Sequence, residues 1–204
     1  RQGEVLRLEV DGADGSLTGT LTGGKLGSEL FAVAGQRNAF ADPTDLPAQA
    51  LLSAYKGYYT VALPVEDCAT DPSVGNVQSG SGYLTMTIKE RGAVKIAGKM
   101  ADGTSVSASV TLLADETGAY VPLFVRLYSK RGLFAGLLRF TGGSAPAEQQ
   151  VDDHAGVLLE WLYPGRSLAL TADRFDARLS AFGAYYNALA NLQINYAGTF
   201  FEAE

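Results

Sequence analysis

The sequence predicts an all-β protein, built as an antiparallel β-barrel or a strongly coiled sandwich of about ten to twelve strands with few short helices. Two observations support this class. Apolar and polar residues alternate with a period of two along segments such as 82–90, 93–100 and 104–113, as they do in strands with one buried face. Turn sequences that contain glycine separate these segments, and glycine supplies the positive φ that tight hairpins need.

The period-two segments define the predicted strands in chain order. These strands cover 5–11, 16–22, 55–63, 82–90, 93–100, 104–113, 121–129, 133–140 and 156–163. Within them, VPLFVRLY and VLLEWLYP are apolar at both alternating positions, so we expect these two strands to be covered on both faces.

Two segments have helical character. The segment 45–55 is predicted to hold a short helix, with Asp45 as its cap and Pro47 in the first turn. The segment 173–190 has enough alanine and leucine for a helix, although Gly183 interrupts it.

A weak internal repeat places a glycine inside three predicted strands, at Gly19, Gly98 and Gly136. A glycine weakens a strand, so its presence indicates a bulge, a sharp bend or the close approach of another backbone. The repeat therefore predicts a strongly coiled sheet that bends at equivalent heights.

Composition restricts the classes of function. The chain has 204 residues, 47% of them hydrophobic and 19% charged, with a net charge of −6. This charge argues against nucleic acid and against an anionic membrane surface as partners. No apolar run is long enough for a transmembrane helix, and the single cysteine, Cys68, excludes an internal disulfide and a zinc site made of cysteines.

The length fits one β domain over 1–204. An alternative division has an N-terminal strand unit at 1–45, a main barrel module at 53–186 and a terminal strand at 189–204. In either case the first and last segments are strand-like, and we expect them to pair within one chain or between successive copies.

The stretch YKGYYTVALP, residues 55–64, raises the question of an aromatic binding platform. Alternation places Tyr55 and Tyr59 on the apolar face with Val61, beside the gap left by Gly57. Tyr58 falls on the polar face. Two of the three tyrosines are therefore predicted to be core residues, and Tyr58 is the candidate contact residue.

The order of motifs from about residue 53 to 165 resembles a β-rich repeat module of very large secreted or surface-anchored bacterial proteins. The resemblance rests on YKGYY, GYLT, the ADG turn, RLY and the strand WLYP, in that order. It implies an extracellular or cell-surface location and a structural or adhesive role, and it carries no established activity.

Candidate ion-binding chemistry is limited to calcium. Asp11, Asp14, Asp42 and Asp45 lie in clusters of oxygen-bearing residues, but none matches the spacing of a calcium loop. Aspartate and glycine are also what ordinary turns require, so we expect no cofactor and only weak calcium candidates.

Catalytic candidates are equally sparse. The single histidine, His154, would need a nucleophile such as Ser144 or Ser167, and no G-x-S-x-G motif is present. Glu160 is unusual in an apolar strand, and we expect a rim position or an ion pair with Arg126 or Arg139. We therefore expect no enzyme.

Two classes of function remain. The first is a non-catalytic structural or adhesive module that binds neighbouring modules, copies of itself or a cell-surface component. The alternative is a β-barrel that binds a carbohydrate or small ligand at a mouth lined by Tyr58, Trp161 or Tyr163. A filled interior would favour the first class, and a large pocket with converging aromatic residues would favour the second.

Overall fold

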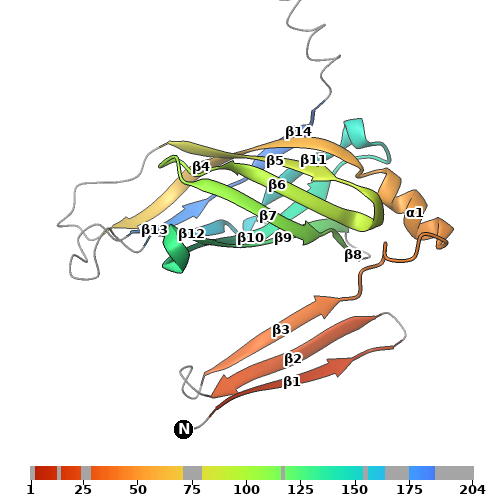
Figure 1. Ribbon diagram of the computed structural model, residues 1–204, viewed down its shortest axis with the longest axis horizontal. Helices are drawn as coiled ribbons and strands as arrows, with labels where there is room; N and C mark the ends of the chain where they lie inside the picture. The colour runs from red at the N-terminus through yellow and green to blue at the C-terminus, as the bar shows by residue number, and fades with distance from the viewer. Residues whose placement is uncertain are drawn as a thin grey trace, which may run out of the picture. The chain divides into compact units, whose positions relative to one another are not determined.

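The computed structural model describes residues 3–12, 15–23, 29–70, 80–115, 118–153, 156–163 and 175–186, with only the backbone at 67–70 and 175. Antiparallel strands dominate these residues, and the predicted all-β class is confirmed (Figure 1). The chain forms two compact units, Arg1–Ala39 and Phe40–Glu204, and each is described by itself. Asp14, His154 and the terminal segment 189–204 lie outside the described residues.

The N-terminal unit is a three-stranded sheet in the order β1-β2-β3. Its strands are β1 (Glu4–Val10), β2 (Ser16–Gly23) and β3 (Leu30–Gln36). Strand β2 pairs along both edges, whereas β1 and β3 each pair along one edge within the described part of the chain. The first two strands confirm the prediction, and the sequence pattern missed β3.

The N-terminal sheet has one apolar face. The register places Leu6 opposite Leu21 and Leu21 opposite Phe31, so these three side chains share a face. The same alternation gives the apolar face as Leu6, Leu8, Val10, Leu17, Leu21, Phe31 and Val33. The opposite face is mixed: it carries Arg7, Glu9 and the threonines of β2 together with Val5, Leu30, Ala32 and Ala34.

The described residues of the main unit form one α-helix and eleven strands. Short 3₁₀ turns lie at Glu90–Gly92, Tyr128–Lys130 and Pro146–Glu148. The helix and strands are α1 (Leu46–Ser53), β4 (Gly57–Thr70), β5 (Ser81–Ile88), β6 (Ala93–Lys99), β7 (Ser105–Thr111), β8 (Leu113–Asp115), β9 (Gly118–Leu127), β10 (Gly132–Thr141), β11 (Gln150–Asp153), β12 (Leu159–Tyr163), β13 (Phe175–Leu179) and β14 (Phe182–Tyr185).

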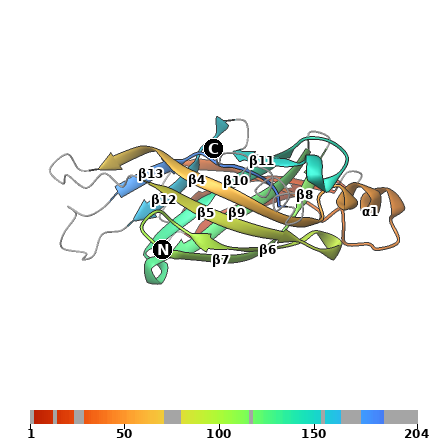
Figure 2. The same cartoon turned by 90° about the horizontal axis from the view of Figure 1, so that it is seen from above.

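The eleven strands form one curled antiparallel sheet (Figures 1 and 2). Strands β4 to β7 form a meander, and β9 and β10 form a hairpin. Along its other edge, β10 pairs first with β12 and then with β11. Strand β12 pairs in turn with β13, and β11 pairs with β14. Both β13 and β14 pair with β4. Strand β7 lies beside β9 without a ladder, so the sheet curls back on itself around the core.

Side chains fill the interior of this curled sheet. Helix α1 begins as predicted: the Asp45 carboxylate accepts a hydrogen bond from the Ala48 N–H at 3.1 Å, and Pro47 lies in the first turn. Leu52 of this helix and Phe40 are fully buried in the same cluster as the strand residues. The bulkiest fully buried residues include Trp161, Tyr59, Phe40, Phe134, Leu52, Leu63, Leu84 and Met86.

Glycines inside strands lie where another chain segment approaches closely, which confirms that part of the prediction. A methyl group at Gly98 would overlap the carbonyl oxygen of Tyr83, and one at Gly19 would overlap that of Arg7. Gly136 belongs to the part of β10 between the residues that pair with β12 and those that pair with β11. It lies against Leu159 and has a φ of 152°. That backbone region is open almost exclusively to glycine.

One expectation was wrong. The strands around VPLFVRLY and VLLEWLYP are not covered on both faces, since Phe124 is 63% exposed and Glu160 is also exposed. A single curled layer has only one interior, so alternate positions face solvent. The described part of 173–190 forms β13 and β14 rather than a helix, because these strands pair along both edges and sheet pairing outweighs the modest helix propensity of alanine and leucine.

Candidate functional site

The tyrosines of YKGYY divide between the two faces of β4 as predicted. Tyr59 is fully buried, Tyr55 is half-buried and Tyr58 is 39% exposed. The gap at Gly57 is filled by the ring of Tyr185 from β14, since a methyl group at Gly57 would overlap that ring. The stretch is therefore mainly a wall of the core.

A cluster of aromatic rings surrounds Tyr59. Its ring meets Phe140 and Tyr185 edge-on, with centroid distances of 5.1 Å and 5.6 Å. Its hydroxyl donates a hydrogen bond to the Tyr55 carbonyl oxygen at 2.8 Å. Burial raises the pKa of Tyr59 far above its ordinary value, so this side chain stays neutral and structural.

Trp161 and Tyr163 come together around Tyr128, and Trp161 is inside the molecule. The Trp161 indole has no exposed surface, and its Nε1–H donates to the Tyr128 hydroxyl at 3.0 Å. That hydroxyl donates to the Asp102 carboxylate at 2.7 Å, and the Tyr128 and Tyr163 rings lie 4.7 Å apart. Trp161 therefore belongs to the core in this structure and does not line an open mouth.

The turn that carries Tyr128 is conformationally strained. Tyr128, Ser129 and Lys130 all have positive φ, at 50°, 55° and 71°. Left-handed conformations are unfavourable for residues other than glycine. This cost is offset by the hydrogen bonds of the Tyr128 hydroxyl and by the contact of its ring with Tyr163. The cluster therefore stabilises the turn of the β9–β10 hairpin.

The buried tyrosines predict a loss of stability at alkaline pH. Burial, followed by the hydrogen bond with Asp102, raises the pKa of Tyr128, and burial raises that of Tyr59. The folded state therefore keeps protons that the unfolded chain loses above pH about 10. The contribution of these two hydroxyls to the free energy of unfolding should be constant below that pH and decrease as pH rises above it.

Urea unfolding across this alkaline range measures the effect. The variant Tyr128→Phe should show a shallower decline than the wild type, because it has one fewer buried hydroxyl. A free energy of unfolding that does not change across the range would contradict the burial of these two hydroxyls.

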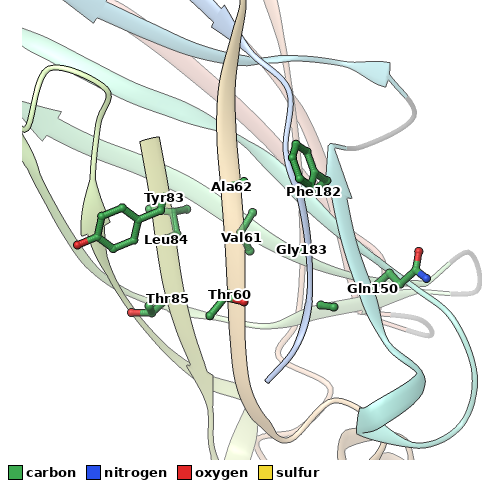
Figure 3. A pocket seen from close by; sticks show the side chains of 10 residues that line it. Thr60, Val61, Ala62, Tyr83, Leu84, Thr85, Gln150, Phe182 and Gly183 are labelled. Carbon is green, nitrogen blue, oxygen red and sulfur yellow. The ribbon is translucent and has the colours of Figure 1, made fainter. Parts of the chain in front are cut away.

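A shallow open groove of about 580 Å³ lies on the outer face of the sheet, over β5, β4, β14 and β11 (Figure 3). Tyr83 and Phe182 stand on its two sides, 50% and 61% exposed. The register puts both residues opposite Ala62, one on each neighbouring strand. Two exposed aromatic rings therefore flank a small side chain on β4.

The next row of the groove contains small polar and apolar residues. Thr60 of β4 lies opposite Thr85 and Ala184, and Ala184 lies opposite Gln150. No Asp, Glu, Lys, Arg or His is among the described residues that line the groove. The groove thus offers ring faces, hydroxyl groups and one amide, which suit neutral ligands rather than acid–base chemistry.

Tyr58 borders this groove at its other side. Its backbone carbonyl accepts a hydrogen bond from the Tyr186 N–H at 2.7 Å, and the two rings meet edge-on at 5.7 Å. Of the three ligand candidates, only Tyr58 is thus near the groove. The sequence analysis did not identify Tyr83 and Phe182 as candidate binding residues. The only feature that could have indicated them is an aromatic side chain at a polar, outward-facing position of a strand.

Two of the aspartate candidates for calcium, Asp42 and Asp45, have structural roles, and Asp11 takes part in the β1–β2 turn through its backbone. The Asp42 carboxylate accepts hydrogen bonds from the backbone and hydroxyl of Thr44, which lower its pKa. Asp45 caps helix α1. Within the described ranges, no group of three or more His, Cys, Asp or Glu side chains is placed to hold a metal ion.

Of the two positions expected for Glu160, the ion pair with Arg126 or Arg139 does not form in the described part of the chain. Arg139 contacts Asp152 at 3.3 Å instead, because these residues are direct cross-strand partners in β10 and β11. Glu160 is exposed on the outer face of β12, opposite Arg178 in the register of β13. Its position is that of a solvated surface residue.

Within the described ranges, no helix combines the length and the apolar character that crossing a membrane requires. No protein-family model matches the chain, and no curated protein matches it.

Proposed function

We propose that the protein is a non-catalytic structural or adhesive module of a secreted or surface-anchored bacterial protein, and that it assembles with copies of itself through its N-terminal sheet. The observation that carries this proposal is the exposed apolar face of β1-β2-β3, together with outer edges of β1 and β3 that have no partner strand among the described residues. The resemblance of residues 53–165 to modules of large extracellular proteins supports the location and the bacterial origin.

A three-stranded sheet with one apolar face needs a second layer. By itself the N-terminal unit is one layer, and Leu6, Val10 and Phe31 of its apolar face are 54%, 69% and 43% exposed. Exposed apolar faces are stabilised when another layer covers them. The outer edges of β1 and β3, which pair with no other strand in the described ranges, offer N–H and C=O groups to an added strand. A second copy supplies both a matching face and a matching edge.

The filled interior favours this class over a barrel that binds a carbohydrate or small ligand at its mouth. Trp161, one of the residues expected at such a mouth, is buried, and Tyr58 lies on the outer face of β4.

Self-association tests the proposal through a matched pair of variants on β1. Leu8→Lys places a charge on the apolar face, and Val5→Lys places the same charge on the opposite face of the same strand. Leu8 and Val5 are similarly exposed, at 45% and 50%. In sedimentation velocity of the full chain, we expect concentration-dependent association of the wild type and of Val5→Lys, and a shift toward monomer for Leu8→Lys. A wild type that stays monomeric at high concentration would contradict the assembly role.

A further inference from the structure

The groove on the outer face of the main unit is part of a longer track across the sheet. Its central row, which begins with Gln150, Ala184, Thr60 and Thr85, continues to Ala97 of β6 and Ser107 of β7. Direct cross-strand partners share a face, so these small uncharged residues lie side by side across adjacent strands. With strands about 4.8 Å apart, the row is about 24 Å long.

Aromatic side chains border this track where it crosses β4, β5 and β14. Tyr83 and Phe182 lie on one side, and Tyr58 and Tyr186 lie on the other. All four are at least 39% exposed. Each aromatic border lies two residues along the strands from the central row, so the two borders are four residues apart. At about 3.3 Å per residue, their backbones are about 13 Å apart. The track is therefore a trench with aromatic walls and a floor of small residues.

The strands beneath the trench leave one mode of binding open. Strands β4, β5 and β14 are each paired along both edges, so no extended peptide can add to them by backbone pairing. An occupant must be held by side chains alone. Those side chains offer aromatic faces, the Thr60 hydroxyl and the Gln150 amide, and none of the described residues that line the groove is charged. The Thr85 hydroxyl donates its hydrogen to the Ala97 carbonyl oxygen at 3.1 Å, so toward a ligand it can only accept.

We propose that this trench binds a linear neutral glycan that runs across the strands. Sugar rings combine an apolar face with hydroxyl groups around the rim, which matches aromatic rings that stand beside hydroxyl and amide side chains. The open ends of the trench fit a chain rather than a single sugar. The net charge of −6 disfavours an acidic polymer. The proposal extends the adhesive role above by naming its ligand, and it is independent of the apolar face of β1-β2-β3.

Affinity electrophoresis tests the trench, with the full chain run in native gels that contain hydroxyethyl cellulose, xylan, glucomannan or laminarin. We expect at least one polysaccharide to retard the wild type. Phe182→Ala and Tyr83→Ala should each weaken that affinity about tenfold, as the loss of a central interface contact does. Phe124→Ala is the matched control, because Phe124 of β9 is equally exposed at 63% and lies outside the trench. Its retardation should equal that of the wild type.

Electrophoresis at high salt distinguishes glycan binding by aromatic stacking from binding by the charges of the lysines that border the track on β6. Lys95 and Lys99 lie on either side of Ala97, and binding that depended on their charges would be lost at high ionic strength. We expect retardation to persist in 1 M NaCl, about seven times physiological ionic strength.

Three results would overturn the proposal. They are an absence of retardation by all four polysaccharides, an equal loss of binding in Phe124→Ala, and a loss of binding in 1 M NaCl. If Phe182→Ala changes the sedimentation of the chain while no polysaccharide retards the wild type, the trench holds another protein copy and the glycan assignment fails. Self-association that is weakened only by Leu8→Lys tests the proposed role of the N-terminal sheet. The glycan proposal is tested separately, by affinity electrophoresis.

Discussion

Replacement of Tyr59 by alanine should lower the free energy of unfolding of the main unit by about 3–5 kcal/mol. The side chain is fully buried, and its ring packs edge-on against Phe140 and Tyr185. Its removal leaves a cavity between β4, β10 and β14, and it removes the hydrogen bond to the Tyr55 carbonyl. Urea unfolding monitored by far-ultraviolet circular dichroism measures the loss.

The neighbouring residue provides the control. Tyr58→Ala should change the free energy of unfolding by no more than about 0.5 kcal/mol, since its ring lies on the outer face. Tyr59→Phe removes only the hydroxyl and should cost about 1 kcal/mol. Equal unfolding midpoints for Tyr58→Ala and Tyr59→Ala would refute the division of these tyrosines between wall and surface.

Replacement of Trp161 by alanine should also cost about 3–5 kcal/mol. The indole has no exposed surface, and its cross-strand neighbours are Phe134 on β10 and Ala177 on β13. The change also removes the hydrogen bond from Nε1 to the Tyr128 hydroxyl. The variant should therefore unfold at a much lower urea concentration.

Phe182→Ala is the matched aromatic substitution outside the core. It should change stability by no more than about 0.5 kcal/mol, because the ring is 61% exposed, while it weakens glycan retention. Should Trp161→Ala keep the wild-type midpoint, the indole is not a packing residue and a ligand-binding role for it regains support.

Local patterns predicted most of the strands that pair with their neighbours in sequence, with β3 and β8 as the exceptions. Strands β5, β6 and β7 were found because alternation and glycine turns are local signals, and each hairpin closes over a few residues. The short strands β11, β13 and β14 were missed, because four or five residues carry too little alternation to be recognised. Their strand conformation depends on distant partners: β14 pairs with β4, more than a hundred residues earlier.

The candidate site was also predicted only in the part that local sequence patterns determine. The outward position of Tyr58 could be predicted, because alternation within one strand determines which side chains share a face. The trench could not, since Tyr83 and Phe182 are adjacent to the same residue, Ala62, only after β5 and β14 have paired with β4. Trp161 shows the converse case, in which an aromatic residue that suggested a binding mouth is a core side chain.

The sequence by itself determined the all-β class, the faces of its longer strands and the positions where glycine is required, because alternation and turn chemistry act over a few residues. The tertiary structure alone decided which strands became neighbours and that the main sheet curled into a single layer with one interior. It also brought four aromatic side chains together on one outer surface, three of them from β4, β5 and β14 and the fourth, Tyr186, from the residue after β14. The physical reason is that pairing between distant strands depends on the combined burial and hydrogen bonding of the whole sheet, which no local segment encodes.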